Sequence, residues 1–327
     1  MLSYSPLHAR LENDLKKRKL IEPKERLLIG LSGGQDSLCL SKILLDLSKR
    51  WSWDLAIVHC DHGWATDTGI AEHVRGIVQG WNIPFYLKTI QGLPEKEEEA
   101  RKWRYQVFTE IATNQGYNCV LTGHTQSDRA ETLLYNLIRG TGSDGLSALN
   151  WSRALTFGVK LIRPMLNITR KETGQFCLDY DLPIWEDAVN QKLEFARNRI
   201  RLEMIPYLAK HFNTQVEQHL GQTAEILRAE NQYFQVLVDD ILAKVSEPDK
   251  INRKALQDLA LALQRRVIRS FLGHYIHKMP NFEQIEETLF LLKAPNGSKT
   301  STLPGQVLLV VEGDWIVVKS LNKSIDP

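Results

Sequence analysis

A short polar segment, Ser32–Ser37 (SGGQDS), follows the apolar run Arg26–Leu31 and precedes a helical pattern. Its two glycines allow backbone N–H groups at the start of a helix to approach an anion closely. The flanking serines can add hydroxyl donors. Asp36 would repel a bare phosphate, but it can hold a Mg²⁺ ion that bridges phosphate oxygens. The segment therefore predicts a phosphate site; the alternative is a plain strand-to-helix turn.

Other familiar phosphate or metal motifs are missing from the sequence. The segment lacks the Lys-Ser/Thr pair of a Walker A loop and is not GxGxxG, so an ordinary P-loop ATPase and a dinucleotide enzyme are both disfavoured. The four cysteines are widely spaced, without a CxxC pair, at Cys39, Cys60, Cys119 and Cys177. They predict buried reduced thiols rather than a zinc or iron–sulfur site.

Strands and helices alternate around this segment. Apolar runs predict strands at residues 26–31, 54–60, 84–90, 119–123 and 159–165. Helical periodicity lies between them, at residues 37–50, 71–82, 95–116 and 127–140. The fold class is therefore α/β, a doubly wound, Rossmann-like parallel sheet. Ligands bind at the carboxyl ends of such strands, so the segments SGGQDS, HCDHGWATD and TGHTQSD should converge on one crevice.

The chain changes character after residue 210. Thr169 and Glu172 fit a capping box that opens one more helix of the first domain. From residue 211, long helical stretches at 215–245, 254–278 and 282–293 precede two strands around Glu312-Gly313-Asp314. We expect a catalytic domain at 1–210 and a smaller helical domain with a terminal strand pair at 211–327.

Composition narrows the class of protein. The net charge is +2, so any nucleic-acid surface must arise from charge patterning. Apolar runs fall far short of the ~20 residues of a membrane span, and the N-terminus does not read as a signal peptide. We therefore expect a cytoplasmic protein without membrane contact.

Several blocks resemble known families. SGGQDS resembles the pyrophosphatase loop (PP-loop) of the N-type ATP pyrophosphatases, which implies that ATP and Mg²⁺ bind at Ser32, Gly33, Gly34, Gln35, Asp36 and Ser37. Five further segments resemble, in order, blocks of the tRNA(Ile)-lysidine synthases. They are HCDHGWATD, EEEARKWRYQVF, TGHTQSDRAETLLYNLIRGTGSDGLSAL, IRPMLNITRKE and WEDAVNQKLEFARNRIRLEMIPYL. The resemblance covers residues 26–208, and the C-terminal part has weaker motifs and is expected to bind tRNA.

The resemblance implies a two-step reaction. The wobble cytidine of tRNA(Ile) with a CAU anticodon is adenylated by ATP, and pyrophosphate leaves. L-lysine then attacks carbon 2, giving lysidine and AMP. Because the lysine amine has a pKa of ~10.4, a carboxylate must orient it and accept a proton. Asp128 and Glu131 are the candidates, Asp36 holds the metal, and His124 contacts ATP or the activated cytidine; a structural role is the alternative for His124, and a solvated helix charge for the two carboxylates.

Four arginines are candidates for substrate binding. Arg101 and Arg104 lie three residues apart beside Glu97–Glu99, so they serve either phosphate contact or ordinary pairing along a helix. Arg139 is expected to reach the crevice or the tRNA. Arg197 opens the segment RNRIR, which predicts contact with the tRNA backbone, with a solvated face as the alternative.

The chain departs from the family pattern His-His-x-Asp-Asp-Gln at residues 124–129. Thr125, Ser127 and Arg129 replace the second His, the first Asp and the Gln. The sequence leaves open whether another carboxylate, such as Asp61 or Asp67, compensates at Ser127. It also leaves open the oligomeric state, with a homodimer as one option. Rival functions are a PP-loop tRNA thiolation enzyme, an enzyme that adenylates a small molecule, and a non-catalytic tRNA-binding protein.

Overall fold

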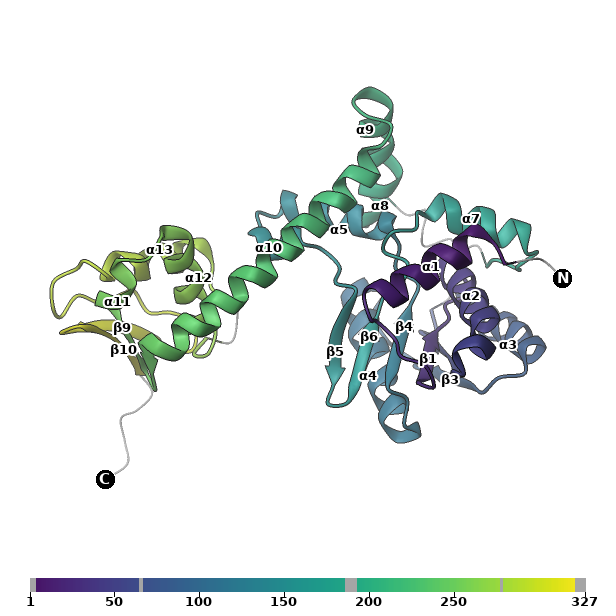
Figure 1. The fold of residues 1–327 in the computed structure, drawn as a ribbon, viewed down its shortest axis with the longest axis horizontal. Coiled ribbons are helices and arrows are strands. Elements are labelled where there is room, and N and C mark those ends of the chain that lie inside the picture. Colours follow the sequence, from purple (N-terminus) through teal and green to yellow (C-terminus); the bar gives the residue numbers. More distant parts are fainter. Residues whose placement is uncertain (1–3, 65–66, 186–192, 277–278, 321–327) are drawn as a thin grey trace. The chain divides into compact units, whose positions relative to one another are not determined.

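A six-stranded sheet forms the centre of the first of two compact units, Met1–Arg228 (Figure 1). The computed structural model describes residues 4–64, 67–185, 193–276 and 279–320. The strands lie in the order β3-β2-β1-β4-β6-β5, and only β5 runs antiparallel to its neighbour. Their bounds are β1 Arg26–Gly30, β2 Asp54–Asp61, β3 Phe85–Thr89, β4 Cys119–Thr122, β5 Ser152–Thr156 and β6 Val159–Ile162. The predicted doubly wound sheet is confirmed.

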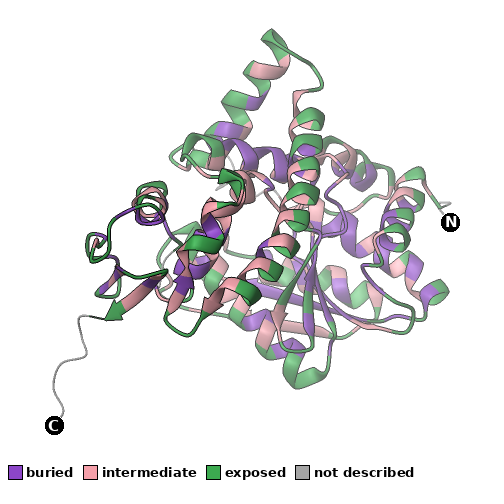
Figure 2. Ribbon diagram, turned by 60° about the vertical axis from the view of Figure 1, so that its left-hand side comes forward, coloured by how far each residue is buried: buried purple, intermediate pink, exposed green. Residues whose placement is uncertain are grey.

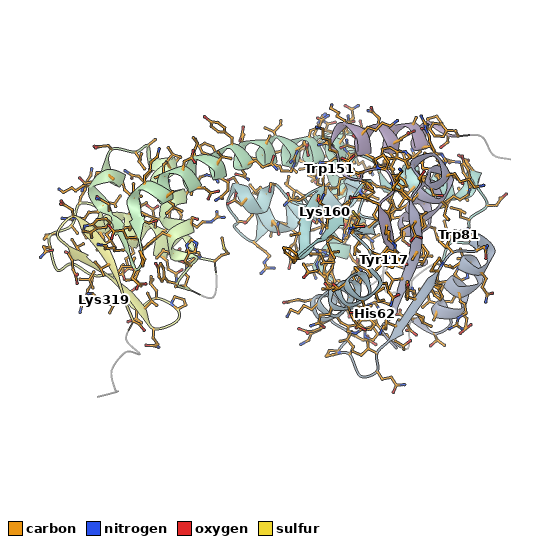
Figure 3. All side chains as sticks on the ribbon, turned by 60° about the horizontal axis from the view of Figure 1, so that its bottom comes forward. His62, Trp81, Tyr117, Trp151, Lys160 and Lys319 are labelled. Carbon is orange, nitrogen blue, oxygen red and sulfur yellow. The ribbon has the colours of Figure 1, made fainter. Side chains whose placement is uncertain are left out.

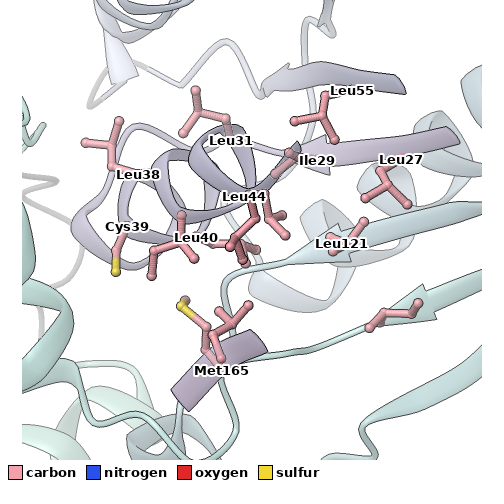
Figure 4. Close-up of a cluster of buried hydrophobic side chains, with 14 of the residues drawn as sticks. Leu27, Ile29, Leu31, Leu38, Cys39, Leu40, Leu44, Leu55, Leu121 and Met165 are labelled. Carbon is pink, nitrogen blue, oxygen red and sulfur yellow. The ribbon is translucent and has the colours of Figure 1, made fainter. Parts of the chain in front are cut away.

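Helices cover both faces of this sheet, because alternate residues of each central strand point to opposite sides. Leu27 and Ile29 of β1 pack in one apolar cluster with residues of α1, α2, α3 and α7. Figure 4 shows part of this cluster, where leucines of α2 lie beside the strands. Leu28 packs in another cluster with Phe108 and its neighbours on α4. Burial is concentrated where these layers meet (Figure 2). The helices are α1 Pro6–Lys17, α2 Gln35–Trp51, α3 Ile70–Trp81, α4 Glu97–Gln115, α5 Gln126–Ile138, α6 Ser143–Leu146 and α7 Arg170–Asp179.

The strand order reverses between β1 and β4. From β1 the chain continues outward to β2 and β3, and then returns to add β4 on the other side of β1. The connections that leave β1 and β4 therefore start side by side and diverge, which opens a crevice at the carboxyl ends of the strands. The SGGQDS segment and the GHTQSD segment are these two connections.

The remainder of the first unit is helical and packs on α5. Ala130 and Leu134 of α5 share an apolar cluster with Ile200 and Ile205. The elements concerned are α8 Ala196–Arg199, a π-helical turn at Ile200–Met204, α9 Ile205–His211 and the part of the long helix α10, Val216–Val245, that precedes residue 229. The continuous helix over residues 196–211 places arginines of the RNRIR segment beside α5.

The second unit, Ala229–Pro327, has its own apolar core around Leu256, Phe271 and Leu309. Its small sheet has the order β7-β8-β10-β9, and three helices follow the end of α10. The bounds are β7 Ser246–Glu247, β8 Lys250–Asn252, α11 Arg253–Gln257, α12 Leu261–Leu272, α13 Phe282–Leu291, β9 Val307–Glu312 and β10 Trp315–Ser320. The compact units divide after Arg228, whereas the functional boundary expected after residue 210 stays a prediction.

Three expectations about elements need correction. The strand expected at 159–165 is the shorter β6, and the sequence did not predict its antiparallel partner β5. The helix expected at 254–278 is broken into α11 and α12. Residues 246–252, which lie between the helices expected at 215–245 and 254–278, pair as β7 and β8. Among the described residues, no helix combines the length and apolarity needed to cross a bilayer.

Candidate active site

The SGGQDS loop joins β1 to the first turn of α2. Gly33 has a φ of +90°, which only glycine adopts without strain, and a Cβ there would lie 3.3 Å from a methyl group of Val74. The Ser37 hydroxyl accepts the Ser32 N–H at 3.1 Å and donates to the Gly34 carbonyl at 2.9 Å. These bonds fix the loop, and the N–H groups of the first turn of α2 have no acceptor within the helix. The geometry suits a phosphate group.

Gly123, directly after β4, lies against the backbone of this loop. A Cβ on Gly123 would lie 2.9 Å from the carbonyl carbon and oxygen of Asp36 and 2.9 Å from the amide nitrogen of Ser37. Only glycine fits between these backbones. The convergence predicted from the strand ends is therefore confirmed for the segments after β1 and β4.

Arg170, the first residue of α7, connects the loop to α5. Its Nε donates to Asp36 Oδ2 at 3.0 Å, and its Nη2 donates to Asp128 Oδ1 at 3.3 Å. Its Nη1 lies 3.7 Å from Glu131 Oε1. Asp36 also accepts the hydroxyl of Thr173. One guanidinium thus bridges the loop carboxylate and both carboxylates of α5.

A second arginine, Arg201, completes the cluster. Its Nε and Nη2 donate to the two oxygens of Glu131 at 2.8 and 3.1 Å. Asp128 caps α5, because its Oδ2 accepts the Thr125 N–H at 2.7 Å and the Thr125 hydroxyl at 2.8 Å. Three carboxylates and two guanidinium groups therefore share the site, which leaves one negative charge in excess when all are ionised.

The environment separates the pKa values of the carboxylates. Burial raises the pKa of Asp36, and the guanidinium of Arg170 offsets this only in part. Burial also raises the pKa of Glu131 against the opposing effect of Arg201. For Asp128, burial acts in the same direction, but Arg170, together with His124 and the Thr125 donors, outweighs it and holds the pKa below its usual range. Asp128 is therefore the most firmly ionised of the three.

His124 lies in the connection between β4 and α5 and is neutral at physiological pH. Its Nδ1 pairs with the Thr122 hydroxyl at 2.9 Å. Burial, with Arg163, Arg101 and Arg104, lowers its pKa to about 3, while Asp128 opposes the shift. A neutral imidazole can accept or donate one hydrogen bond but adds no positive charge.

Arg104 also influences the segment after β2. Burial followed by the Arg104 charge lowers the pKa of His62, which is labelled in Figure 3, to about 4. The His62 ring stacks on the Trp64 ring, with the ring centroids 4.8 Å apart. Arg101 packs over the Tyr105 ring at 5.0 Å. The neighbouring glutamates pair with Lys102 instead, at 3.0 and 3.2 Å. Glu98 and Glu99 are therefore paired with Lys102, and phosphate contact by Arg101 and Arg104 stays a prediction.

Arg139 and Arg197 meet at the other end of α5. Their Cζ atoms lie 5.2 and 5.7 Å from the Tyr135 ring. The hydroxyl of Tyr135 accepts a hydrogen bond from Arg139 at 2.9 Å, and Arg197 pairs with Glu97 at 2.5 Å. Asp128 belongs to the first turn of this helix and Arg139 caps its end, so these two arginines form a patch separate from the carboxylates.

The donor set is compatible with a magnesium–nucleotide complex. Among the residues that the structure describes, no three His, Cys, Asp or Glu side chains form a metal cage. Mg²⁺ is usually held by one or two carboxylates together with substrate phosphates, which matches one carboxylate, Asp36, at a phosphate loop. The nucleotide would supply the other oxygens.

The four cysteines do not provide a reactive thiolate. All are buried: Cys39, Cys60, Cys119 and Cys177. Burial raises the pKa of Cys60 and of Cys177 to about 12, and it raises the pKa values of the other two as well. Inert thiols fit the sequence prediction and disfavour chemistry at cysteine.

The sequence profile of the PP-loop domain matches residues 4–208. A tRNA(Ile)-lysidine synthase from Synechocystis sp. is 50% identical over 323 residues, 96% of this chain and 98% of that protein. One from Nostoc sp. is 46% identical over 97% of this chain and 98% of that protein. The chain belongs to the tRNA(Ile)-lysidine synthase family. Both the predicted PP-loop fold and the predicted family are confirmed.

One solved structure shares the fold of this family member. A U34-tRNA thiolase from Methanococcus maripaludis, solved with its 4Fe-4S cluster, matches with a TM-score of 0.57 and 17% identity. The match covers 68% of this chain and 78% of that one. At this identity the likeness concerns the PP-loop fold, and it does not favour thiolation over lysidine formation.

Sequence reasoning missed several residues of the site in this tRNA(Ile)-lysidine synthase family member. Arg170 and Thr173 were not predicted, because in the sequence they look like ordinary helix residues after the capping residue Thr169. The predicted capping box of Thr169 and Glu172 is confirmed. Arg201 was predicted only as part of a basic segment, yet it pairs with Glu131. The hydroxyl of Ser127 donates to Glu217, whereas Asp61 and Asp67 make other contacts.

Proposed function

We propose that this chain catalyses the family reaction: ATP-dependent adenylation of the wobble cytidine of tRNA(Ile) with a CAU anticodon, then attack by L-lysine to form lysidine, AMP and pyrophosphate. The observation that carries the proposal is the Arg170 bridge. It joins the carboxylate of the phosphate loop to the two carboxylates of α5. The phosphate loop, which would bind ATP, and the α5 carboxylates, which would bind the lysine ammonium, therefore belong to one cluster. A ligase that acts in two steps needs both sites close together.

The loop residues serve the first step. Ser32–Ser37 bind the phosphates through backbone N–H groups and hydroxyls, with Gln35 fastening the loop to α7 by donating to the Arg170 carbonyl at 2.6 Å. Asp36 holds Mg²⁺, which when bound neutralises charge on the leaving pyrophosphate. His124 offers a neutral imidazole near the loop, suited to a hydrogen bond with ATP or with the cytosine ring.

The carboxylates of α5 serve the second step. The two α5 carboxylates are suited to a cationic partner, which fits the ammonium group of lysine. Asp128, firmly ionised, orients this ammonium. Glu131, whose pKa is raised, is the better proton acceptor of the two. The lysine amine must lose a proton before it can attack the adenylated carbon.

The arginines serve the tRNA. Arg101 and Arg104 bind phosphate groups near the crevice, and Arg139 and Arg197 contact the tRNA backbone from the far end of α5. An anticodon loop is single-stranded, so its wobble base can enter the crevice without melting a duplex. The second unit contributes to tRNA binding, and the reaction takes place in the cytoplasm.

The experiment is pyrophosphate release with ATP, Mg²⁺ and unmodified tRNA(Ile) with a CAU anticodon, with and without L-lysine. Nucleoside mass analysis follows. We expect a lysine-dependent mass gain on the wobble cytidine, lost in Asp36→Asn and retained in Asp181→Asn. Asp181 is exposed and has a φ of 49°, which Asn also tolerates. Pyrophosphate without lysine incorporation would refute the second step, and no pyrophosphate would refute the whole proposal.

A further inference from the structure

The Ser127 hydroxyl lies between the active-site cluster and the start of α10. Its oxygen accepts the backbone N–H of Arg170 at 3.0 Å. Its proton is donated to Oε1 of Glu217, in the first turn of α10. The side chain of Ser127 is buried, and Glu217 is half-buried. A chain of two hydrogen bonds therefore runs from α10 through α5 to the first residue of α7.

We propose that Glu217 is a positioning residue for the reaction, acting through Ser127 on Arg170. The inference rests on the proposed function in one respect, that the Arg170 bridge serves catalysis. In this arrangement Glu217 fixes the backbone of Arg170, and the Arg170 guanidinium then holds Asp36 and Asp128 at their working separation.

The carboxylate has a definite effect on the serine. A hydroxyl rotates freely and can present either its proton or a lone pair to a neighbour. Glu217 accepts the proton, so a lone pair is left facing the Arg170 N–H. A hydroxyl that donates to a carboxylate is also a stronger acceptor, because hydrogen bonds in a chain polarise one another. Ser127 with Glu217 therefore acts as a better acceptor than serine alone.

Both peptide groups of Arg170 are held from outside its own helix. The N–H is held by Ser127, and the carbonyl accepts the side-chain amide of Gln35 at 2.6 Å. The N–H of the first helical residue has no partner within the helix, so an external acceptor decides its orientation. The backbone of Arg170 is thus fastened to α5 on one side and to the phosphate loop on the other.

A second contact shows that α10 is docked on α5 at this point. Nη2 of Arg129 lies 3.1 Å from Oε2 of Glu225, eight residues after Glu217 and on the same side of α10. Arg129 is 1% exposed. The plain alternative is that Glu217 only stabilises the N-terminus of α10 through the helix dipole. That role predicts a change in stability without a specific change in turnover.

The test compares Ser127→Ala, Glu217→Ala and the double variant, with Glu230→Ala as control. Glu230 is exposed on the same helix, so this control removes an equal charge. We expect kcat for pyrophosphate release to fall about tenfold in each single variant, with KM for ATP changed less than about twofold. The double variant should be no slower than the singles, because both break one chain. Ser127→Asp with Glu217→Gln, which moves the carboxylate one residue along the chain of hydrogen bonds, should recover kcat to within about threefold.

Hydrogen exchange provides a readout that does not need turnover. Exchange at the start of α7 should rise in Glu217→Ala and stay unchanged in Glu230→Ala. Multiplying effects in the double variant, an unchanged kcat, or a failed rescue would overturn the inference. A wild-type protein without turnover, but with the expected change in exchange, would refute the proposed function while supporting the link from Glu217 to Arg170.

Discussion

Gly123→Ala tests whether the site depends on direct backbone contact between the phosphate loop and the end of β4. The added methyl group would lie 2.9 Å from three backbone atoms of Asp36 and Ser37. Comfortable carbon contacts begin at about 3.5 Å, so the two segments must separate by at least roughly 0.6 Å. Backbone atoms cannot rotate away as a side chain would.

This separation has two consequences of different size. Overpacking of this kind costs about 1–3 kcal/mol of stability. The same shift moves the Asp36 carboxylate relative to the α5 carboxylates, and a misplacement of ~1 Å in a catalytic group can lower the rate about 100-fold. We therefore expect a fall in kcat of about 100-fold, together with a loss of only about 1–3 kcal/mol in the free energy of unfolding.

The assay is pyrophosphate release at saturating ATP and tRNA, with thermal unfolding measured on the same preparations. Gly76→Ala is the control, because a Cβ at that position in α3 meets nothing within 4 Å. It should keep full activity and gain about 0.5–1 kcal/mol of stability. If Gly123→Ala keeps kcat within twofold of the wild type, the close approach does not position Asp36 and the reasoning is refuted.

Three further predictions concern the charged groups. Arg170→Lys should lower kcat about 30-fold without unfolding the protein, because a single ammonium cannot bridge several carboxylates as a guanidinium does; steady-state kinetics and circular dichroism would check this. Glu225→Gln should lower the free energy of unfolding by about 3 kcal/mol at pH 7, because it leaves the buried charge of Arg129 without its carboxylate. Although burial raises the pKa of Glu225, hydrogen bonds from Arg228 and Trp151 and the charge of Arg129 outweigh it, so the folded pKa lies below the unfolded one. The stability gained is therefore complete above pH ~4.3 and is lost as pH falls further, so urea unfolding of the two proteins should converge in acid. Glu131→Gln removes the proton acceptor of the second step, so it should lower kcat for lysine incorporation about 100-fold and leave lysine-independent pyrophosphate release within twofold.

The fold was largely predictable because central parallel strands are continuous apolar runs. β1, β2 and β4 each appear as such a run, and the alternation with helices then implies the doubly wound sheet. β5 could not be predicted in the same way. Its sequence, SRALT, lies at the sheet edge with all five residues exposed or half-exposed, so it lacks a buried pattern. It pairs with β6 across the two-residue turn 157–158, and the exposure pattern of its own residues does not reveal that pairing.

The site was predictable where a residue follows a strand end and was not predictable where it arrives from a distant helix. Asp36 and Asp128 follow β1 and β4, so the strand order alone brings them together. Arg170 sits at the start of a helix whose local sequence explains only its capping box. Arg201 and Glu217 lie 70 and 90 positions from the residues that they contact on α5. No spacing rule connects such pairs.

Contacts between residues far apart in the sequence explain both of the α5 residues that differ most from the family pattern. Ser127 and Arg129 replace an acidic and an amide residue, and local sequence alone suggests that the site has lost a carboxylate. Each instead contacts an acidic residue of α10, Glu217 and Glu225 respectively. Where the family pattern has an acidic residue, Ser127 contacts the carboxylate of Glu217 on α10. The positive charge of Arg129 is paired with a second carboxylate of α10, that of Glu225. Residues 211–327 contain 13 Lys/Arg and 14 Asp/Glu, so their composition does not indicate this arrangement. The packing of α10 on α5 reveals it.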